Sequence, residues 1–177
     1  MLREHGIERD IKKHKSQNQG QWYYEQHDLG YNFRMSDINA ALGISQLSKI
    51  NTILKKRNTI QKFIVNKLRK LPIIFQEHTS YSSCHLTIAI VSEKIHKNLF
   101  NFLRKKKIFV NLHYIPIYMH PFFKFNIKDC KKQYLNSEKY YKSAISLPNH
   151  YNLTVKDLNF FVNQVKIFFK KNNLKIE

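Results

Sequence analysis

The chain has 177 residues, of which 42% are hydrophobic and 14% aromatic, enough for one domain, or for one small domain with part of another. Its 31 Lys and Arg residues against 12 Asp and Glu give a formal net charge of +19, which suits nucleic acid or an anionic membrane surface. The lysines are scattered through almost every segment, so we favour a generally basic, solvated surface and keep nucleic-acid binding as the alternative.

Cysteine, histidine and the apolar runs narrow the class of protein further. The two cysteines, Cys84 and Cys130, form no CxxC pair and no disulfide framework, which indicates a reduced, cytoplasmic protein. No HExxH motif is present, and the closest histidines, such as His113 and His120, lie across a proline-broken segment, so no metal site is expected. No apolar run approaches the ~20 residues that span a bilayer, and the first residues do not resemble a signal peptide. We therefore expect a soluble protein without a membrane partner.

The first predicted elements are a long loop and a long helix. Residues 7–35 show neither helical nor alternating periodicity, and a loop of that length is uncommon unless it is functional or belongs to a larger domain. Ser36 is placed to cap a helix, and apolar residues at helical spacing then predict one long or once-broken helical stretch over 37–70. Pro72 ends this pattern.

A sheet with a crossing helix is predicted next. Residues 73–78 and 84–91 are rich in β-branched and aromatic residues and indicate two strands. Helical spacing returns over 94–106, and a further strand is predicted over 108–115. The pattern is that of a β-β-α-β unit.

The C-terminal third is predicted to be mainly helical. A short helix is expected around residues 136–145, followed by a turn-rich break over 146–154. Thr154 is placed to cap a last helix that carries a continuous apolar side, and its lysines gather in the last turns, where the helix dipole favours cations.

Three polar residues crowd the junction between the long loop and the first helix. Asn32 and Arg34 offer an amide and a guanidinium to an anion near the positive end of a helix, and Asp37 opens that helix. Helix-start Asn, Ser and Asp residues more often act as caps than as ligands, so both interpretations stay open at this point.

A second candidate lies at the end of the strand predicted over 108–115. His113 and Tyr114 come before Pro116 and Pro121, which favour an extended and rigid connection. A histidine beside aromatic residues suits proton transfer or stacking on a sugar, and the alternative is a histidine with a purely structural hydrogen bond.

Four collinear motifs carry a resemblance to a known family. They are "LREHGIERD", "WYYEQHDLGYNFRMSDINAALGISQL", "VNLHYIPIYMHPFF" and "SLPNHYNLT". Together they resemble the C-terminal half of the DegT/DnrJ/StrS family of pyridoxal-phosphate-dependent sugar aminotransferases. The stretch "WYYEQHDLGYN" is most similar to the branch that aminates a UDP-linked 4-keto-6-deoxy-N-acetylhexosamine in pseudaminic acid biosynthesis.

The resemblance implies an α/β fold, the C-terminal part of a fold-type-I pyridoxal-phosphate-dependent transferase. Residues 1–35 would be a remnant of the large domain with a loop that crosses to the other subunit of a homodimer. Residues 36–71 would be a connecting helical segment, and residues 72–177 a small C-terminal α/β domain.

The resemblance also assigns roles to the candidate residues. Asn32 would contact the phosphate of pyridoxal 5'-phosphate in the other subunit, while Arg34 and Asp37 would hold this arm and start the helix. His113 and Tyr114 would lie on the sugar side of the active site. Tyr118 stands where the family commonly has a histidine, so that family role does not carry over. The expected partners are a nucleotide sugar and glutamate as amino donor. Amination at a different ring position of the keto-sugar stays open as an alternative.

The catalytic lysine of the family lies in the half that would precede Met1, so no residue of this chain is predicted to be catalytic. We expect the missing N-terminal half to be encoded upstream, the chain alone to be inactive, and an apolar face to be exposed where that half would pack.

Overall fold

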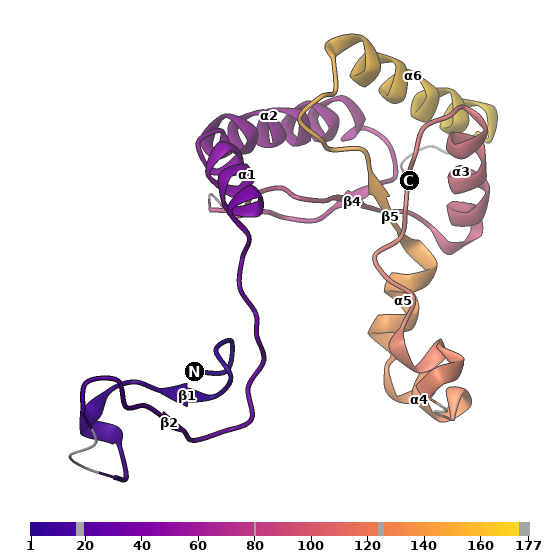
Figure 1. Cartoon of the computed structure of the whole chain (residues 1–177). Helices are drawn as coiled ribbons and strands as arrows, with labels where there is room; N and C mark the ends of the chain where they lie inside the picture. The colour runs from indigo at the N-terminus through magenta and orange to yellow at the C-terminus, as the bar shows by residue number, and fades with distance from the viewer. Residues whose placement is uncertain (17–19, 80, 124–125, 174–177) are drawn as a thin grey trace. The chain divides into compact units, whose positions relative to one another are not determined.

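A computed structural model describes residues 1–16, 20–79, 81–123 and 126–173 (Figure 1). Its contacts divide the chain into two compact units, residues 1–50 and 51–177. The segment 36–71, predicted to be a connecting helical segment, therefore contributes its first helix to one unit and nearly all of its second helix to the other. The three-part division of the chain stays a prediction.

The first unit contains a short strand pair, one 3-10 turn and one helix. Strand β1 (Ile7–Glu8) pairs antiparallel with β2 (Glu25–Gln26), and the 3-10 turn η1 (Ile11–Lys13) follows β1. A separate antiparallel bridge joins Glu4 to Asn32. The predicted loop over 7–35 thus contains a small strand ladder, which was missed because its strands have two residues each and show no alternation.

The predicted helical stretch over 37–70 is confirmed in its once-broken form. Helix α1 (Asp37–Leu47) begins after Ser36, whose Oγ accepts a hydrogen bond from the Asn39 amide at 3.4 Å. Helix α2 (Ile50–Leu68) follows after two residues. Only α2 buries side chains, and these are four residues apart: Ile60, Ile64 and Leu68. This spacing places them on one side of the helix.

The second unit is built on a three-stranded antiparallel sheet in the order β3-β4-β5. Strands β3 (Ile74–Phe75) and β4 (Thr87–Ile90) lie within the predicted ranges 73–78 and 84–91, which are confirmed as strand regions although the strands are shorter. Strand β5 (Ala144–Leu147) pairs with β4 so that Ala89 lies opposite Ile145.

The third strand was predicted wrongly. The range 108–115 forms only an isolated bridge, in which Asn111 and Ser146 exchange two backbone hydrogen bonds of 3.1 and 2.8 Å. The sheet takes β5 instead, from residues predicted as the end of a helix and the start of a turn. The short helix itself is confirmed as α5 (Leu135–Ser143), which ends directly before β5.

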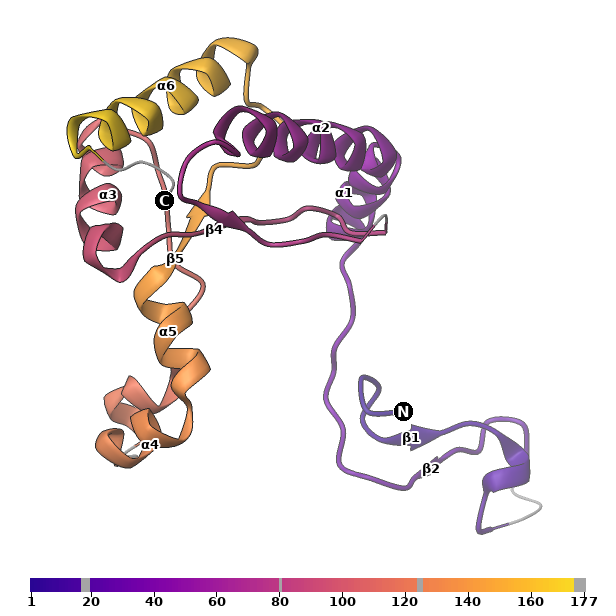
Figure 2. The same ribbon diagram turned by 180° about the vertical axis from the view of Figure 1, so that it is seen from behind.

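Helices cover one face of this sheet. Helix α3 (Glu93–Lys105) occupies the range predicted over 94–106, and α6 (Val155–Lys171) follows Thr154 as predicted. Figures 1 and 2 show α2, α3 and α6 gathered around β4 and β5. Together they form one apolar cluster, whose largest members include Ile60, Ile64, Leu68, Leu99, Leu103, Ile145, Leu147, Phe161, Val165, Phe168 and Phe169.

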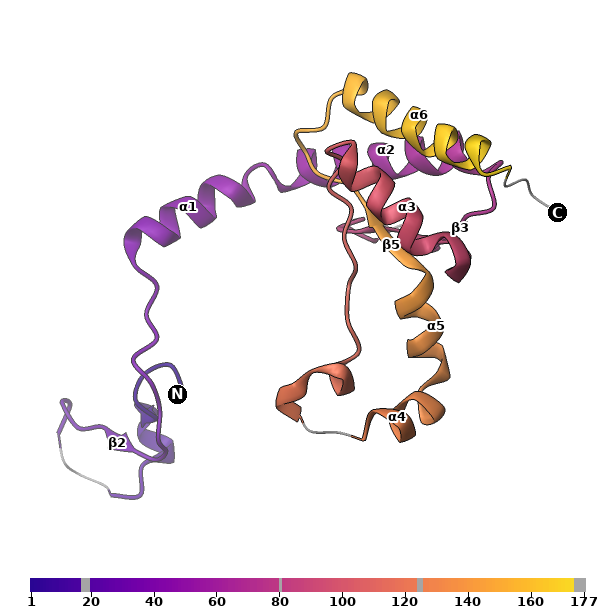
Figure 3. The ribbon, with the colours of Figure 1, turned by 90° about the vertical axis from the view of Figure 1, so that its right-hand side faces the viewer.

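A second group of short helices follows residues 108–115, here called the edge segment because Asn111 bridges to β5, the last strand of the sheet. It comprises the 3-10 turns η2 (Ile117–Met119) and η3 (Pro121–Phe123), helix α4 (Ile127–Gln133) and α5. Figure 3 shows α5 leading into β5 from the end of the strand that lies away from α6. This group follows His113 and Tyr114 in the chain and returns to the strand beside which they lie.

Candidate functional site

Asn32 lies in the isolated antiparallel bridge that it forms with Glu4 in the first unit. The amide of His5 donates to the Tyr31 carbonyl at 2.9 Å, and the amide of Phe33 donates to the Arg3 carbonyl at 3.0 Å. These two bonds fix the backbone on both sides of Asn32, whose side chain is exposed. Among the described residues, no hydrogen bond is recorded for this side chain, so its amide is available to a group from outside the chain.

An aromatic pair flanks Asn32. The rings of Tyr31 and Phe33 stack with centroids 4.7 Å apart and planes 5° from parallel. Because side chains alternate along an extended strand, this pair and Asn32 project from opposite sides of the backbone. Both rings are about two-thirds exposed, at 64% and 65%. The segment therefore presents a polar side and an aromatic side to its surroundings.

Arg34 and Asp37 follow Asn32 without contacting it. Asp37 is the first residue of α1, as expected for an acidic residue at the positive end of a helix. Both side chains are exposed, and the structure records no ion pair between them within the described ranges. Sequence proximity thus brings Asn32 and Arg34 to the segment directly before α1 and Asp37 to its first turn, and their assigned roles stay predictions.

His113 lies against β5 in the second unit. Its Nδ1 is 2.6 Å from the Oγ of Ser146, a buried residue. Ser146 is paired with Asn111 on the edge segment, and its neighbours Ile145 and Leu147 belong to the helix-covered core. Alternation along β5 therefore places Ser146 and His113 on the other face of the sheet. The half-buried imidazole keeps one nitrogen that this contact does not use.

Tyr114 is the exposed partner of this histidine. The two rings meet edge to face at a centroid distance of 4.7 Å, and the Tyr114 side chain is 75% exposed. The structure thus brings the two residues predicted to bind the substrate together. The His113 ring is held by Ser146, and the Tyr114 ring is exposed.

Tyr118 occupies a different kind of position. It is buried, and its hydroxyl donates a hydrogen bond of 2.6 Å to the carboxylate of Glu138, which is also buried. Burial, reinforced by the neighbouring Glu138, raises the pKa of Tyr118 to about 12. The ring also stacks on Tyr134. Tyr118 is therefore part of the packing between η2 and α5.

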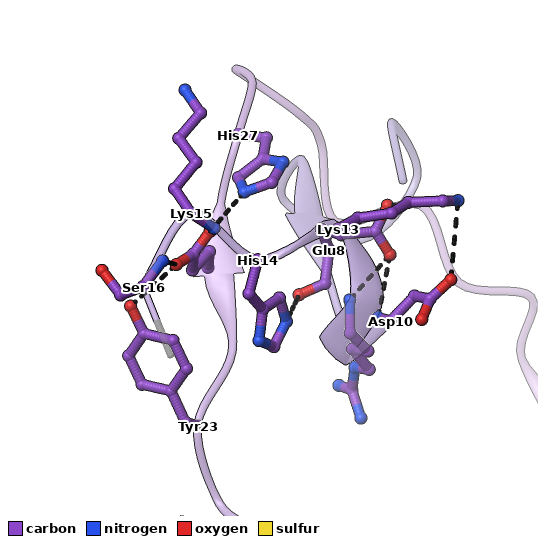
Figure 4. Close-up of polar contacts among 10 residues, drawn as sticks. Glu8, Asp10, Lys13, His14, Lys15, Ser16, Tyr23 and His27 are labelled. Carbon is purple, nitrogen blue, oxygen red and sulfur yellow. Dashed lines mark hydrogen bonds and ion pairs between the residues drawn. The ribbon is translucent and has the colours of Figure 1, made fainter. Parts of the chain in front are cut away.

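Sequence reasoning missed one polar cluster in the first unit, centred on Glu25 and shown in Figure 4. Tyr23, Glu25 and His27 alternate through the stretch "YYEQH", so an extended backbone places all three on the same side. That spacing was the available signal. The hydrogen bond from His27, followed by those from backbone amides and Tyr23, lowers the pKa of Glu25 to about 2.

In residues 1–16, 20–79, 81–123 and 126–173, no group of three or more His, Cys, Asp or Glu side chains is arranged to hold a metal ion. In the same ranges, no helix has the length and apolar character needed to cross a membrane.

Comparison with known proteins covers nearly the whole chain. The model of the DegT/DnrJ/EryC1/StrS aminotransferase family matches residues 1–166. The UDP-4-amino-4,6-dideoxy-N-acetyl-beta-L-altrosamine transaminase of Campylobacter jejuni subsp. jejuni serotype O:2 is 34% identical over 166 residues. This match covers 90% of the chain and 41% of the relative, so the chain spans less than half the length of that protein.

Solved structures give the same picture. PseC of Helicobacter pylori, an aminotransferase involved in pseudaminic acid biosynthesis, is 25% identical with a TM-score of 0.74, covering 96% of this chain and 44% of its own. Spr1654 of Streptococcus pneumoniae, described as a sugar aminotransferase and solved in a PMP form, is 25% identical with a TM-score of 0.77. The latter match covers 96% of this chain and 43% of the solved chain.

Proposed function

Because this chain belongs to the DegT/DnrJ/EryC1/StrS aminotransferase family, we propose that it is the C-terminal portion of a nucleotide-sugar aminotransferase. The observation that carries the proposal is the alignment of 90% of the chain with 41% of a sugar transaminase. The proposed substrate is a UDP-linked 4-keto-6-deoxy sugar, aminated for a surface glycan of the pseudaminic acid type, and the proposed amino donor is glutamate.

Asn32 fits the phosphate of pyridoxal 5'-phosphate, the cofactor that we propose for the intact enzyme. When bound, this cofactor takes an amino group from the donor and gives it to the keto-sugar. Asn32 has an exposed amide without a recorded hydrogen bond among the described residues, on a backbone fixed at both neighbours. An amide N–H is a suitable donor to a phosphate oxygen. We propose that it reaches the cofactor phosphate in the other subunit of a homodimer.

His113 and Tyr114 are proposed to contact the sugar. The Ser146 hydroxyl, 2.6 Å from Nδ1, fixes the orientation of the imidazole and leaves the other ring nitrogen for a sugar hydroxyl. The open ring of Tyr114 offers an apolar surface of the kind on which sugar rings stack. In this proposal His113 holds the substrate in place and Tyr114 excludes water from one side of it.

The remaining catalytic groups are proposed to lie in the N-terminal part of the intact enzyme, which holds the lysine that binds the cofactor covalently. We propose that this part packs on the exposed apolar side of α1, and that the chain by itself is inactive. A cytoplasmic location is also proposed, in agreement with the free thiols of Cys84 and Cys130.

The assignment of Asn32 is tested by restoring the N-terminal part, as a fused chain or as a separately expressed fragment. Asn32→Ala should weaken cofactor binding by roughly 1.5–3 kcal/mol, which corresponds to about 10- to 150-fold, because a hydrogen bond to a charged group is lost. Pyridoxal-phosphate affinity is measured by absorbance.

The control is Asn39→Ala, which changes the same residue type at another exposed position in α1. This variant should bind the cofactor with the affinity of the parent. Equal affinities for Asn32→Ala and the parent would remove the cross-subunit contact from the proposal.

A further inference from the structure

The first unit holds its shape without an apolar core. Among the described residues of this unit, Gly6 alone is buried. The geometry of the segment that carries Asn32 must therefore come from hydrogen bonds and close backbone contacts. Any group that collects several of these bonds has a large influence on where Asn32 lies.

The carboxylate of Glu25 collects four such bonds. Oε2 accepts from the Lys15 amide at 2.7 Å and lies 2.6 Å from Nε2 of His27. Oε1 accepts from the Ser16 amide at 2.7 Å and from the Tyr23 hydroxyl at 3.0 Å. Only 10% of the Glu25 side chain is exposed. Figure 4 shows Lys15, Ser16, Tyr23 and His27 close to one another.

A second contact ties the same part of the chain to β1. Nε2 of His14 lies 3.1 Å from the Glu8 carbonyl oxygen, and the His14 ring meets Tyr23 edge to face at 5.4 Å. Tyr23 in turn donates to Glu25. The Glu25 cluster, defined as Lys15, Ser16, Tyr23, Glu25 and His27, is therefore joined to β1 as well as to β2.

A series of backbone contacts leads from Glu25 toward Asn32. Glu25 belongs to β2, and the backbone amide of His27, two residues later, donates to the Gly6 carbonyl at 3.0 Å. A Cβ atom added to Gly30 would lie 2.1 Å from the Gly6 nitrogen, so the two backbones touch there. The Glu4 and Asn32 bridge follows directly.

We propose that Glu25 is a positioning residue for the cofactor contact of this family member: its largely shielded carboxylate holds residues 15–16 and 23–27 together and, through the paired backbones, fixes the place of Asn32. The functional half of this inference rests on the proposed function of Asn32. The structural half is independent of it, since it concerns only hydrogen bonds within this chain.

The structural half is tested on the full 177-residue chain by amide hydrogen exchange. In Glu25→Gln, an NH₂ group replaces one carboxylate oxygen. The two groups that donated to that oxygen then face another donor and lose their acceptor. Exchange at Lys15, Ser16, His5 and Phe33 should become about tenfold faster or more, because their acceptors or supporting contacts are lost.

Glu8→Gln is the matched control. Among the described residues, the Glu8 carboxylate accepts backbone hydrogen bonds from Arg9 and Asp10 and forms an ion pair with Lys13, all within five residues of it. This variant should therefore change exchange mainly at the Arg9 and Asp10 amides and leave His5 and Phe33 unchanged. Unchanged exchange at His5 and Phe33 in Glu25→Gln would overturn the proposal, whatever happens at Lys15 and Ser16.

The functional half is tested in the restored enzyme by a double-mutant cycle. Glu25→Gln should weaken pyridoxal-phosphate binding in the parent background and have no further effect on Asn32→Ala, because the first residue acts through the second. Additive losses would show a general loss of structure and would overturn the positioning role. If Asn32→Ala itself binds the cofactor normally, the proposed function of Asn32 fails and the exchange experiment still decides the structural half.

Discussion

At the scale of single residues, Tyr118 is a packing position with a buried hydrogen bond. Its hydroxyl is the recorded side-chain partner of Glu138 among the described residues, and both groups are buried. The pair links the turn η2, which follows His113 and Tyr114, to α5, which precedes β5. The cost of breaking it arises mainly from Glu138, which would be left buried without a donor.

We therefore expect Tyr118→Phe to lower the midpoint of thermal unfolding by about 2–4 °C, followed by far-ultraviolet circular dichroism. Tyr134→Phe is the control, since its ring stacks on Tyr118 but its hydroxyl has no recorded hydrogen bond among the described residues. That variant should unfold at the temperature of the parent. Equal midpoints for the two variants would mean that the bond to Glu138 contributes nothing to stability.

The contact between His113 and Ser146 is a residue-scale feature that the sequence did not predict. The two residues are 33 positions apart, and Ser146 lies in a segment expected to be a turn. The motif around His113 was sufficient to nominate it and Tyr114, because a histidine and an aromatic residue before two prolines form an unusual local pattern. The partner of the imidazole, Ser146, is brought beside it by strand pairing. A local sequence pattern does not indicate that pairing.

At the scale of elements, the last helix is fixed by its first turn. Thr154 and Asp157 form a reciprocal cap: the Asp157 amide donates to Thr154 Oγ1 at 3.2 Å, and the Thr154 amide donates to the Asp157 carboxylate at 2.9 Å. The side-chain and backbone hydrogen bonds from Thr154 lower the pKa of Asp157. Helix α6 supplies six buried residues to the core of its unit, so its start matters for the whole unit.

Thr154→Ala should therefore destabilise residues 51–177 by about 1 kcal/mol. Urea unfolding followed by circular dichroism measures this change. The matched variant Ser36→Ala removes a cap from α1, which buries no side chain, and should leave that transition unchanged. An equal loss in both variants would contradict the separation of the chain into two units.

Long elements with helical spacing were predictable, and short ones were not. Apolar residues recur at helical spacing in the range 37–70, in the helix predicted over 94–106 and in α6. The structure has helices in all three regions. Strand β5 has four residues that are all buried, and it therefore lacks the alternation that marks a half-exposed strand. The range 108–115 has strand-forming residues, but only Asn111 of it finds a pairing partner. Strand pairing in the tertiary structure determines which of these two segments joins the sheet, and local propensity does not indicate that pairing.

At the scale of the whole molecule, the first unit exposes an unusual amount of apolar surface. Helix α1 buries no residue although it contains several large aliphatic side chains. The exposed large hydrophobic residues of this unit are Met1, Leu2, Ile11, Trp22, Tyr24, Leu29, Tyr31, Phe33, Met35, Ile38, Leu42, Ile44, Leu47 and Ile50. Surfaces of this kind normally mark an interface.

We expect the chain by itself to bind a hydrophobic dye and to self-associate. Ile38→Lys should reduce both effects, because it places a charge within the apolar surface of α1. Ile74→Lys makes the same change at an exposed position of β3 in the other unit and should reduce them less. Dye fluorescence and light scattering over a concentration series measure the outcome. A monomeric chain that leaves the dye unbound would contradict the expectation.

The apolar cluster of the second unit also has a consequence during protein synthesis. It joins Ile60, Ile64 and Leu68 of α2 to Phe161, Val165 and Phe169 of α6, so it needs the first and last helices of the unit together. A ribosome adding about 5–20 residues per second takes roughly 4–17 s to pass from the end of α2 to the start of α6. Throughout that interval α2 has been synthesised but the helix that completes its core has not. A nascent chain held at this stage is the form in which chaperones would meet this protein.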